Sequence, residues 1–290
     1  MQPDWFQKNI AHQPAHGHVT VAGARIHYQH WAAPGRPALV LVHGHAAHSH
    51  WWDFIAPGFN SEFDIVAIDL SGNGDSDHRE QYSAAGFAEE IMAASRHAGQ
   101  QAPIIMGHSF GGAMARITAY LHQEVSGLLL VDSAIPARRG RRNPPPMPTT
   151  RTRLYPSQAE AARRFRLRPP QPRPAQYIVD YIAGHSVKAV DGGWQFKLDP
   201  ALFARMPPDM DLPTAREMIR ALTIPKGFIY GTESRFFNDD AARELDELFD
   251  PGRVIPIPDA YHHVFLDQPE RFIEAARGLL ASLSNSNAPQ

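Results

Sequence analysis

The 290-residue chain contains no cysteine. This absence excludes a disulfide scaffold, a thiolate nucleophile, and zinc or iron–sulfur sites with cysteine ligands. A strong charge of either sign is also missing, because 28 Lys and Arg nearly balance 30 Asp and Glu and leave a formal net charge of -2 at pH 7. Such a chain has no overall field that would gather nucleic acid or an anionic membrane. We therefore expect neither nucleic-acid nor membrane binding to be its main function.

Long hydrophobic runs are absent as well. A membrane-spanning helix needs about 18 or more apolar residues in succession, and the apolar segments here, such as ALVLV (38–42) and GLLLV (127–131), have the length of buried strands. The start of the chain has no basic segment followed by an apolar run, so we expect no secretory signal and a cytoplasmic location. With 43% hydrophobic and 20% charged residues, the composition allows a sizeable core.

Strands and helices alternate along most of the sequence. Residues 18–31 predict a hairpin that turns at Ala22 and Gly23. Apolar runs predict buried strands at 38–42, 64–68, 103–106, 127–131, 226–230 and 254–257, and helical periodicity predicts helices over 83–97, 113–122, 239–249 and 269–283. This order predicts an α/β fold, with a mostly parallel sheet and helices on both faces.

The composition changes abruptly after Pro136. Residues 137–174 contain eleven arginines, a run of three prolines and a single acid, Glu160. A regular sheet cannot continue through such a stretch. We therefore predict a core formed by 1–135 and 223–290, and a largely helical or irregular cap formed by the insertion 136–222.

The arginines between Arg138 and Arg173 have two interpretations. The simpler one is a solvated surface. The alternative is that they bias a nearby site towards acidic substrates. Nucleic-acid binding is disfavoured, because only Tyr155 and Phe165 are interspersed among them as aromatic partners.

A G-x-S-x-G pattern lies between a predicted strand and a predicted helix. It consists of Gly107, His108, Ser109, Phe110 and Gly111. A sharp strand-to-helix turn leaves no room for side chains two residues before and after the serine, and it exposes the hydroxyl at a helix N-terminus. We predict that Ser109 is a nucleophile and that the backbone N–H of Phe110 contributes to an oxyanion hole.

At this point the sequence resembles the α/β-hydrolase family. His43 and Gly44 resemble the family's HG turn, which implies that the backbone N–H of His45 is the second oxyanion donor. The segment 69–77 resembles the family's DxxGxGxSD loop, to which we assign a structural role. The resemblance covers 18–134 and 226–283, whereas the segment between them matches only in position.

A serine hydroxyl needs a base, and histidine is the usual one. In the family, the catalytic histidine lies in the loop between the last strand and the last helix, five residues before an acid and seven before a proline. Asp267 and Pro269 place that register on His262. The neighbouring His263 is the alternative.

The acid of the triad departs from the common pattern. Residues 230–234 resemble the family's GxxD segment after strand seven, but Ser234 stands at the position of the aspartate. Two carboxylates are available as replacements: Glu233, one residue early, and Asp132, at the end of the preceding strand. We favour Asp132, because some relatives, including haloalkane dehalogenases, carry their acid after strand six.

The histidine-rich run 43–50 is not expected to bind a metal. Its four histidines have no helical i, i+4 spacing and enclose no carboxylate. Gly72 and Gly74 lack the third glycine of a dinucleotide fingerprint, so we expect no cofactor. Trp51 and Trp52 either pack against the sheet or line a substrate site.

These residues together predict a serine hydrolase that cleaves a small carboxylic ester or lactone through an acyl-enzyme. Hydrolysis of a C–C bond in a diketone is an alternative reaction on the same scaffold, and a non-catalytic ligand-binding protein is an alternative of another class. Epoxide hydrolase and dehalogenase activities are disfavoured, because relatives with those activities have aspartate where this chain has Ser109.

Overall fold

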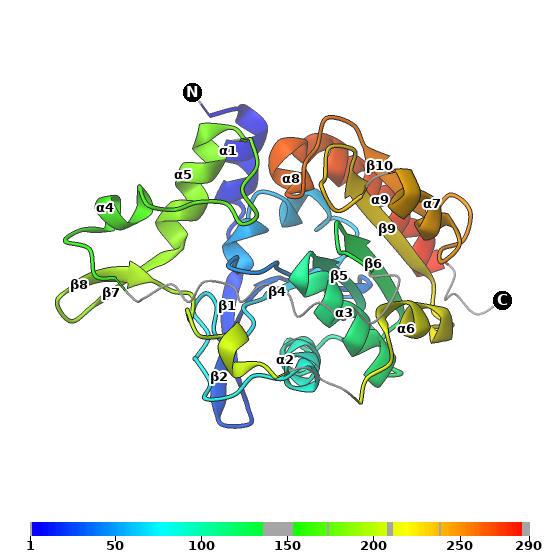
Figure 1. The fold of residues 1–290 in the computed structure, drawn as a ribbon, viewed down its shortest axis with the longest axis horizontal. Coiled ribbons are helices and arrows are strands. Elements are labelled where there is room, and N and C mark those ends of the chain that lie inside the picture. The colour runs from blue at the N-terminus through cyan, green and yellow to red at the C-terminus, as the bar shows by residue number, and fades with distance from the viewer. Residues whose placement is uncertain (1, 136–152, 173, 208–210, 238, 286–290) are drawn as a thin grey trace.

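The computed structural model describes residues 2–135, 153–172, 174–207, 211–237 and 239–285. Its centre is an eight-stranded sheet in the order β1-β2-β4-β3-β5-β6-β9-β10 (Figure 1). The strands are β1 (Ala15–Val21), β2 (Ala24–Trp31), β3 (Ala38–Val42), β4 (Asp64–Ile68), β5 (Ile104–His108), β6 (Gly127–Val131), β9 (Lys226–Gly231) and β10 (Val254–Ile257). Among the described residues, no helix has both the length and the hydrophobicity needed to cross a lipid bilayer.

Strand pairing agrees with the prediction of a mostly parallel sheet. β1 and β2 form the expected antiparallel hairpin, and β2 pairs antiparallel with β4. From β4 to β10 every neighbouring pair is parallel. The carboxyl ends of β3, β5, β6 and β10 therefore meet at one edge of the sheet, which is where open α/β sheets hold their ligands.

Helices cover both faces of the sheet. They are α1 (Asp4–Ala11), α2 (Ala84–His97), α3 (Phe110–Leu121), α6 (Ala215–Ala221), α7 (Asp239–Asp246), α8 (Val264–Asp267) and α9 (Pro269–Asn285). Successive strand residues point to opposite faces: Val40 belongs to the core that includes α2 and α3, while Leu39 and Leu41 belong to the core that includes α9. Ser83 caps α2, because its hydroxyl accepts a hydrogen bond from the Gly86 N–H.

The predicted insertion 136–222 is described from residue 153 onwards, apart from residue 173 and residues 208–210. It contains α4 (Gln158–Ala162), α5 (Gln176–His185), β7 (Val187–Val190), β8 (Gly193–Phe196) and, shortly before β9, α6. In Figure 1, α4, β7 and β8 lie to one side of the sheet, and α5 lies beside α1. The contact between α1 and α5 is aromatic: the Phe6 ring packs edge-on against Tyr177 and Tyr181.

The hairpin of β7 and β8 is an element that the sequence analysis did not identify. It turns at Asp191 and Gly192, where Gly192 adopts φ 85°. An Asp-Gly pair between two short β-prone segments is a hairpin signal, so the information was present in the sequence. The boundaries 136 and 222 of the insertion themselves stay a prediction.

Candidate active site

Ser109 occupies a strained turn between β5 and α3. Its backbone has φ 53° and ψ -118°, a conformation that L-residues rarely adopt and that is found where function requires it. The glycines around it are sterically required: a Cβ on Gly107 would lie 2.4 Å from the carbonyl oxygen of Gly111, and a Cβ on Gly111 would lie 2.2 Å from that of His43. Close packing of three backbone segments therefore holds the serine at the start of α3.

His262 lies against this serine. Its Nε2 is 2.8 Å from Ser109 Oγ, and its Nδ1 is 2.6 Å from Asp132 Oδ1. The neighbouring His263 points elsewhere. Its ring is buried and packs against Trp51, and its backbone N–H donates to Gln171 Oε1 at 3.0 Å. Of the two candidate histidines, the structure brings only His262 to the serine.

Asp132 follows β6 directly and is fully buried. Besides His262, its carboxylate accepts hydrogen bonds from the Gly231 N–H at 3.1 Å and the Ser234 hydroxyl at 2.8 Å. The other candidate acid, Glu233, is exposed, and its nearest side-chain partner is the hydroxyl of its neighbour Thr232 at 3.5 Å. The structure thus places Asp132 against the histidine. The sequence analysis did not find Ser234 as a partner of Asp132.

Burial shifts the pKa values of both His262 and Asp132. Burial lowers the pKa of His262, and the positive charge of Arg235 lowers it further. Burial raises the pKa of Asp132, while the hydrogen bonds from Gly231 and Ser234 favour its ionised form and oppose that rise. The imidazole is therefore neutral at pH 7, which is the form that accepts a proton from a hydroxyl.

The two predicted oxyanion donors belong to segments that pack against the serine. Phe110 is the first residue of α3, and His45 follows Gly44, at which a Cβ would come within 3.3 Å of Ser109 Cβ. Among the described residues, neither backbone N–H has a hydrogen-bond acceptor. The rings of His45 and Phe110 both pack against Phe203, at 4.5 and 5.4 Å between centroids.

The histidines of the run 43–50 have separate partners. His43 Nδ1 donates to the Gly44 carbonyl, His48 is hydrogen-bonded to Ser186, and His50 to Asp53. His50, Asp53 and His185 each offer one ligand atom within 4.8 Å of the others. However, the rings of His50 and His185 are stacked 4.0 Å apart at 22°, so one ion cannot lie in both ring planes.

The two tryptophans after this run belong to the hydrophobic core. Trp51 and Trp52 are buried on the α9 side of the sheet. Trp52 stacks on Phe265 at 4.7 Å, and Trp51 packs edge-on against His263. Of the two interpretations, packing therefore accounts for both side chains.

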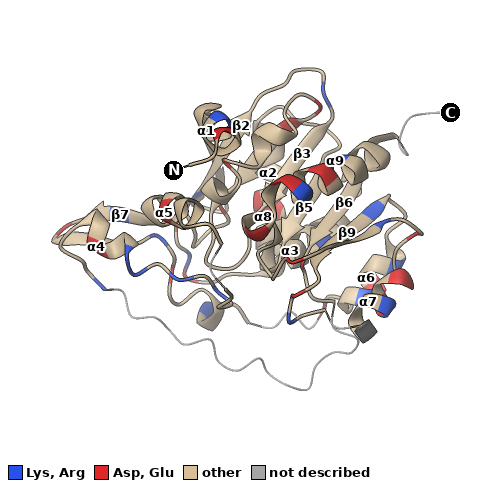
Figure 2. Ribbon diagram, turned by 90° about the horizontal axis from the view of Figure 1, so that it is seen from above, with Lys and Arg blue, Asp and Glu red and all other residues tan. Residues whose placement is uncertain are grey.

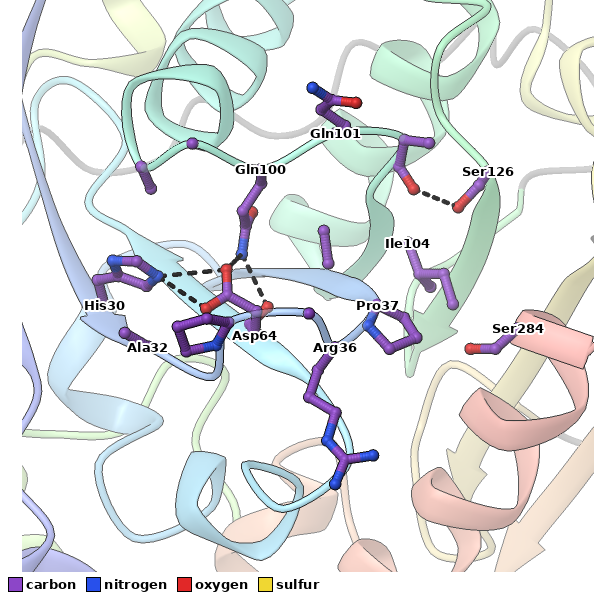
Figure 3. Close-up of a pocket in the computed structure, with 16 residues that line it drawn as sticks. His30, Ala32, Arg36, Pro37, Asp64, Gln100, Gln101, Ile104, Ser126 and Ser284 are labelled. Carbon is purple, nitrogen blue, oxygen red and sulfur yellow. Dashed lines mark hydrogen bonds and ion pairs between the residues drawn. The ribbon is translucent and has the colours of Figure 1, made fainter.

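A pocket at the opposite edge of the sheet has no comparable chemistry (Figure 3). Its lining includes residues at the amino ends of β3, β4 and β5. The one acid among them, Asp64, is fully engaged: it accepts hydrogen bonds from His30 Nε2, the Ala33 N–H and Gln100 Nε2. These bonds join the start of β4 to β2 and to the loops that contain Ala33 and Gln100, which is a structural role for Asp64. Ser109 and its neighbours are therefore the better candidate for an active site.

A family model described as "Alpha/beta hydrolase family" matches residues 39–275. The chain belongs to this family. This α/β-hydrolase is 26% identical to a pimeloyl-[acyl-carrier protein] methyl ester esterase of Edwardsiella ictaluri over 264 residues, 86% of this chain and 95% of that protein. The match to human epoxide hydrolase 4 is 30% identical but spans only 113 residues, 38% of this chain and 31% of that protein.

Solved structures share the fold. The α/β-hydrolase superposes on esterase Rv0045c of Mycobacterium tuberculosis with a TM-score of 0.73 at 22% identity, covering 97% of this chain and 99% of that one. At that level of identity the likeness establishes the fold. The expectations of an α/β-hydrolase fold and of membership of that family are confirmed.

Proposed function

We propose that the protein is a serine hydrolase that cleaves a small carboxylic ester or lactone. In this proposal Ser109 attacks the acyl carbon while His262 accepts its proton, and Asp132 holds the imidazole and stabilises its protonated form. The backbone N–H groups of Phe110 and His45 hold the oxyanion. His262 then returns the proton to the leaving alcohol, and a water molecule activated by the same histidine hydrolyses the acyl-enzyme.

The observation that carries the proposal is the continuous hydrogen-bonded chain from Ser109 through His262 to Asp132, with distances of 2.8 and 2.6 Å. Support also comes from the relatives, because the matches that span most of this chain include two proteins named as esterases. Some relatives that match a shorter part of this chain are named epoxide hydrolases. Ser109 at the strained turn argues against that reaction here, because relatives with that activity have aspartate at this position.

A fluorophosphonate probe tests the nucleophile directly. Intact mass measurement should show one adduct on the wild-type chain and none on Ser109→Ala, whose fold is checked by circular dichroism. Equal labelling of the variant, or no labelling of folded wild-type protein, would contradict the proposal and favour a ligand-binding role. A panel of 4-nitrophenyl esters, lactones and diketones then separates ester hydrolysis from C–C bond hydrolysis.

A further inference from the structure

A pocket of about 710 Å³ lies between the cap residues and the loop that follows β3. This volume is in the range of small-molecule sites. On one side it begins at Ala46 and Ala47, directly after the proposed oxyanion donor His45. Its walls include apolar side chains such as Phe165 and Leu198, and its cationic lining residues are Arg153, Arg164, Arg166, Arg168, Lys197 and Arg205.

The positive charge of this pocket is only partly balanced. Lys197 pairs with Asp75 at 2.7 Å, and Arg205 pairs with Asp199 at 3.2 Å. The other four arginines that line the pocket form no ion pair with any described residue. Figure 2 shows this concentration of basic residues on the loop between α4 and α5. Arg166 Nη1 donates to the backbone carbonyls of Arg163 and Phe165, and the Arg153 guanidinium lies over the Tyr155 ring. Exposed guanidinium groups that are not paired with a carboxylate can bind an anion in two-pronged geometry.

The same loop is attached to the proposed reaction centre. Gln171 Nε2 donates to both carboxylate oxygens of Asp267 at 3.0 Å, and Gln171 Oε1 accepts the backbone N–H of His263. Arg168 lies three residues before Gln171. Burial, with the charge of Arg168 as the second cause, lowers the pKa of His45 to about 4. Gln171 thus joins the end of this loop to the loop of the proposed catalytic histidine, and Arg168 is near enough to His45 for its charge to act on that ring.

We propose that this arginine-lined pocket binds an anionic oxygen group, a carboxylate or a phosphate, at the end of the substrate remote from the scissile ester. This inference rests on the proposed hydrolase function and names its substrate class: esters of small acids that carry a second anionic group. The apolar walls contact the chain between the two groups. Of the two interpretations of the arginine-rich segment, its described part therefore favours recognition of acidic substrates. Arg138, Arg139, Arg141, Arg142, Arg151 and Arg173 lie outside the described residues.

Three 4-nitrophenyl esters of equal chain length test the inference. The first ends in a carboxylate (the monoester of adipic acid), the second in a phosphonate, and the third in a neutral carboxamide of nearly the same shape. At low salt, kcat/KM for at least one anionic ester should exceed that for the carboxamide about tenfold or more, mainly through KM. The advantage should shrink at 0.5 M NaCl, because the arginines are exposed and screened. The two anionic esters show which group the pocket prefers.

The neighbouring arginines supply a matched control. Arg163 is exposed but does not line the pocket, whereas Arg166 and Arg168 do. In the double variant Arg166→Ala/Arg168→Ala, kcat/KM for the preferred anionic ester should fall to within about twofold of kcat/KM for the carboxamide ester. Arg163→Ala should keep the wild-type preference. Arg163→Ala should also leave turnover of the carboxamide ester unchanged.

Failure of this inference is distinguishable from failure of the proposed function. If Ser109-dependent hydrolysis occurs but the three esters have equal kcat/KM, or if Arg163→Ala reduces the preference as much as the double variant, the pocket inference is wrong and the hydrolase stands. Calorimetric titration of Ser109→Ala with adipate monoamide gives a readout without turnover. Binding that is lost in Arg166→Ala/Arg168→Ala supports the pocket, and binding that the double substitution leaves unchanged overturns it.

Discussion

Ser234 donates a 2.8 Å hydrogen bond to Asp132 Oδ1, the same oxygen that accepts the hydrogen bond from His262. The serine thus stands where the family pattern has an aspartate, and it supports Asp132, the proposed acid at the end of the neighbouring strand β6. A carboxylate at both positions would bring two negative charges together in a buried site, which is unfavourable.

Loss of the Ser234 hydroxyl should weaken this support. Ser234→Ala removes one of the donors that favour the ionised form of Asp132, so kcat should fall about tenfold while the protein stays folded. Steady-state kinetics measures the effect, and Ser284→Ala on α9 is the control, with expected wild-type kinetics. Unchanged kcat in Ser234→Ala would mean that Gly231 and His262 suffice to hold the carboxylate.

The two candidate acids should differ sharply in their effect on kcat. Asp132→Asn leaves the shape of the side chain but removes the charge that orients and stabilises the imidazolium, so kcat should fall on the order of ten-thousandfold. Glu233→Gln changes an exposed side chain and should stay within about twofold of wild type. Thermal unfolding of both variants checks their stability. If Glu233→Gln lowered kcat strongly and Asp132→Asn left kcat nearly unchanged, our assignment of the acid would be wrong.

The pH at which kcat/KM falls to half of its plateau on the acid side should lie below the ordinary pKa of histidine. Burial and the charge of Arg235 lower the pKa of His262, so the imidazole stays neutral and competent as a base further into the acid range. kcat/KM should therefore hold its plateau as pH falls through 6.5, the ordinary pKa of histidine, and decline only at lower pH.

Arg235→Gln separates the two causes. It removes a positive charge that disfavours the imidazolium, so the midpoint of the acid limb should move to higher pH. Arg243→Gln, at an arginine that is not among the causes of the lowered His262 pKa, should leave the limb in place. A limb that moves to lower pH in Arg235→Gln would have the wrong sign and would contradict the electrostatic account of His262.

The crowded backbone around the serine predicts a large loss of stability on adding one methyl group. Gly111→Ala would place Cβ 2.2 Å from the His43 carbonyl oxygen, so the free energy of unfolding should fall by about 3 kcal/mol or more. Gly278→Ala is the matched control, because it lies within α9 with nothing within 4 Å of the new Cβ. It should raise the free energy of unfolding by about 0.5–1 kcal/mol. Chemical denaturation measures both.

The sequence predicts the sheet well because its strands are short, uninterrupted apolar runs. Residues 64–68 become β4 without change of bounds, and 254–257 become β10. The helix predicted at 113–122 instead begins at Phe110, because Gly111 and Gly112 obscure the helical pattern although tight packing requires them. Contacts between distant segments are harder to predict. Ser234 and Asp132 are 102 residues apart in sequence, and no local pattern connects them.

The arginine-rich segment shows the same limit. Its charge is visible in the sequence, but which side chains line a pocket depends on the path of the loop between α4 and α5. Gln171 anchors that loop through bonds to Asp267 and His263, which join residues more than 90 positions apart. Neither periodicity nor composition indicates such a contact.

If Asp132 at the end of β6 is the acid, as proposed, nearly all of the proposed catalytic groups lie in the first part of the chain. Ser109, Asp132 and both proposed oxyanion donors belong to one continuous segment that ends before the insertion, and His262 is the one proposed catalytic group that follows it. The described part of the insertion touches the histidine loop through Gln171. Exchanging the insertion for one of another length or charge, with that glutamine retained, should therefore alter which ester is accepted and leave the bond-breaking step intact, so selectivity can be engineered separately from catalysis.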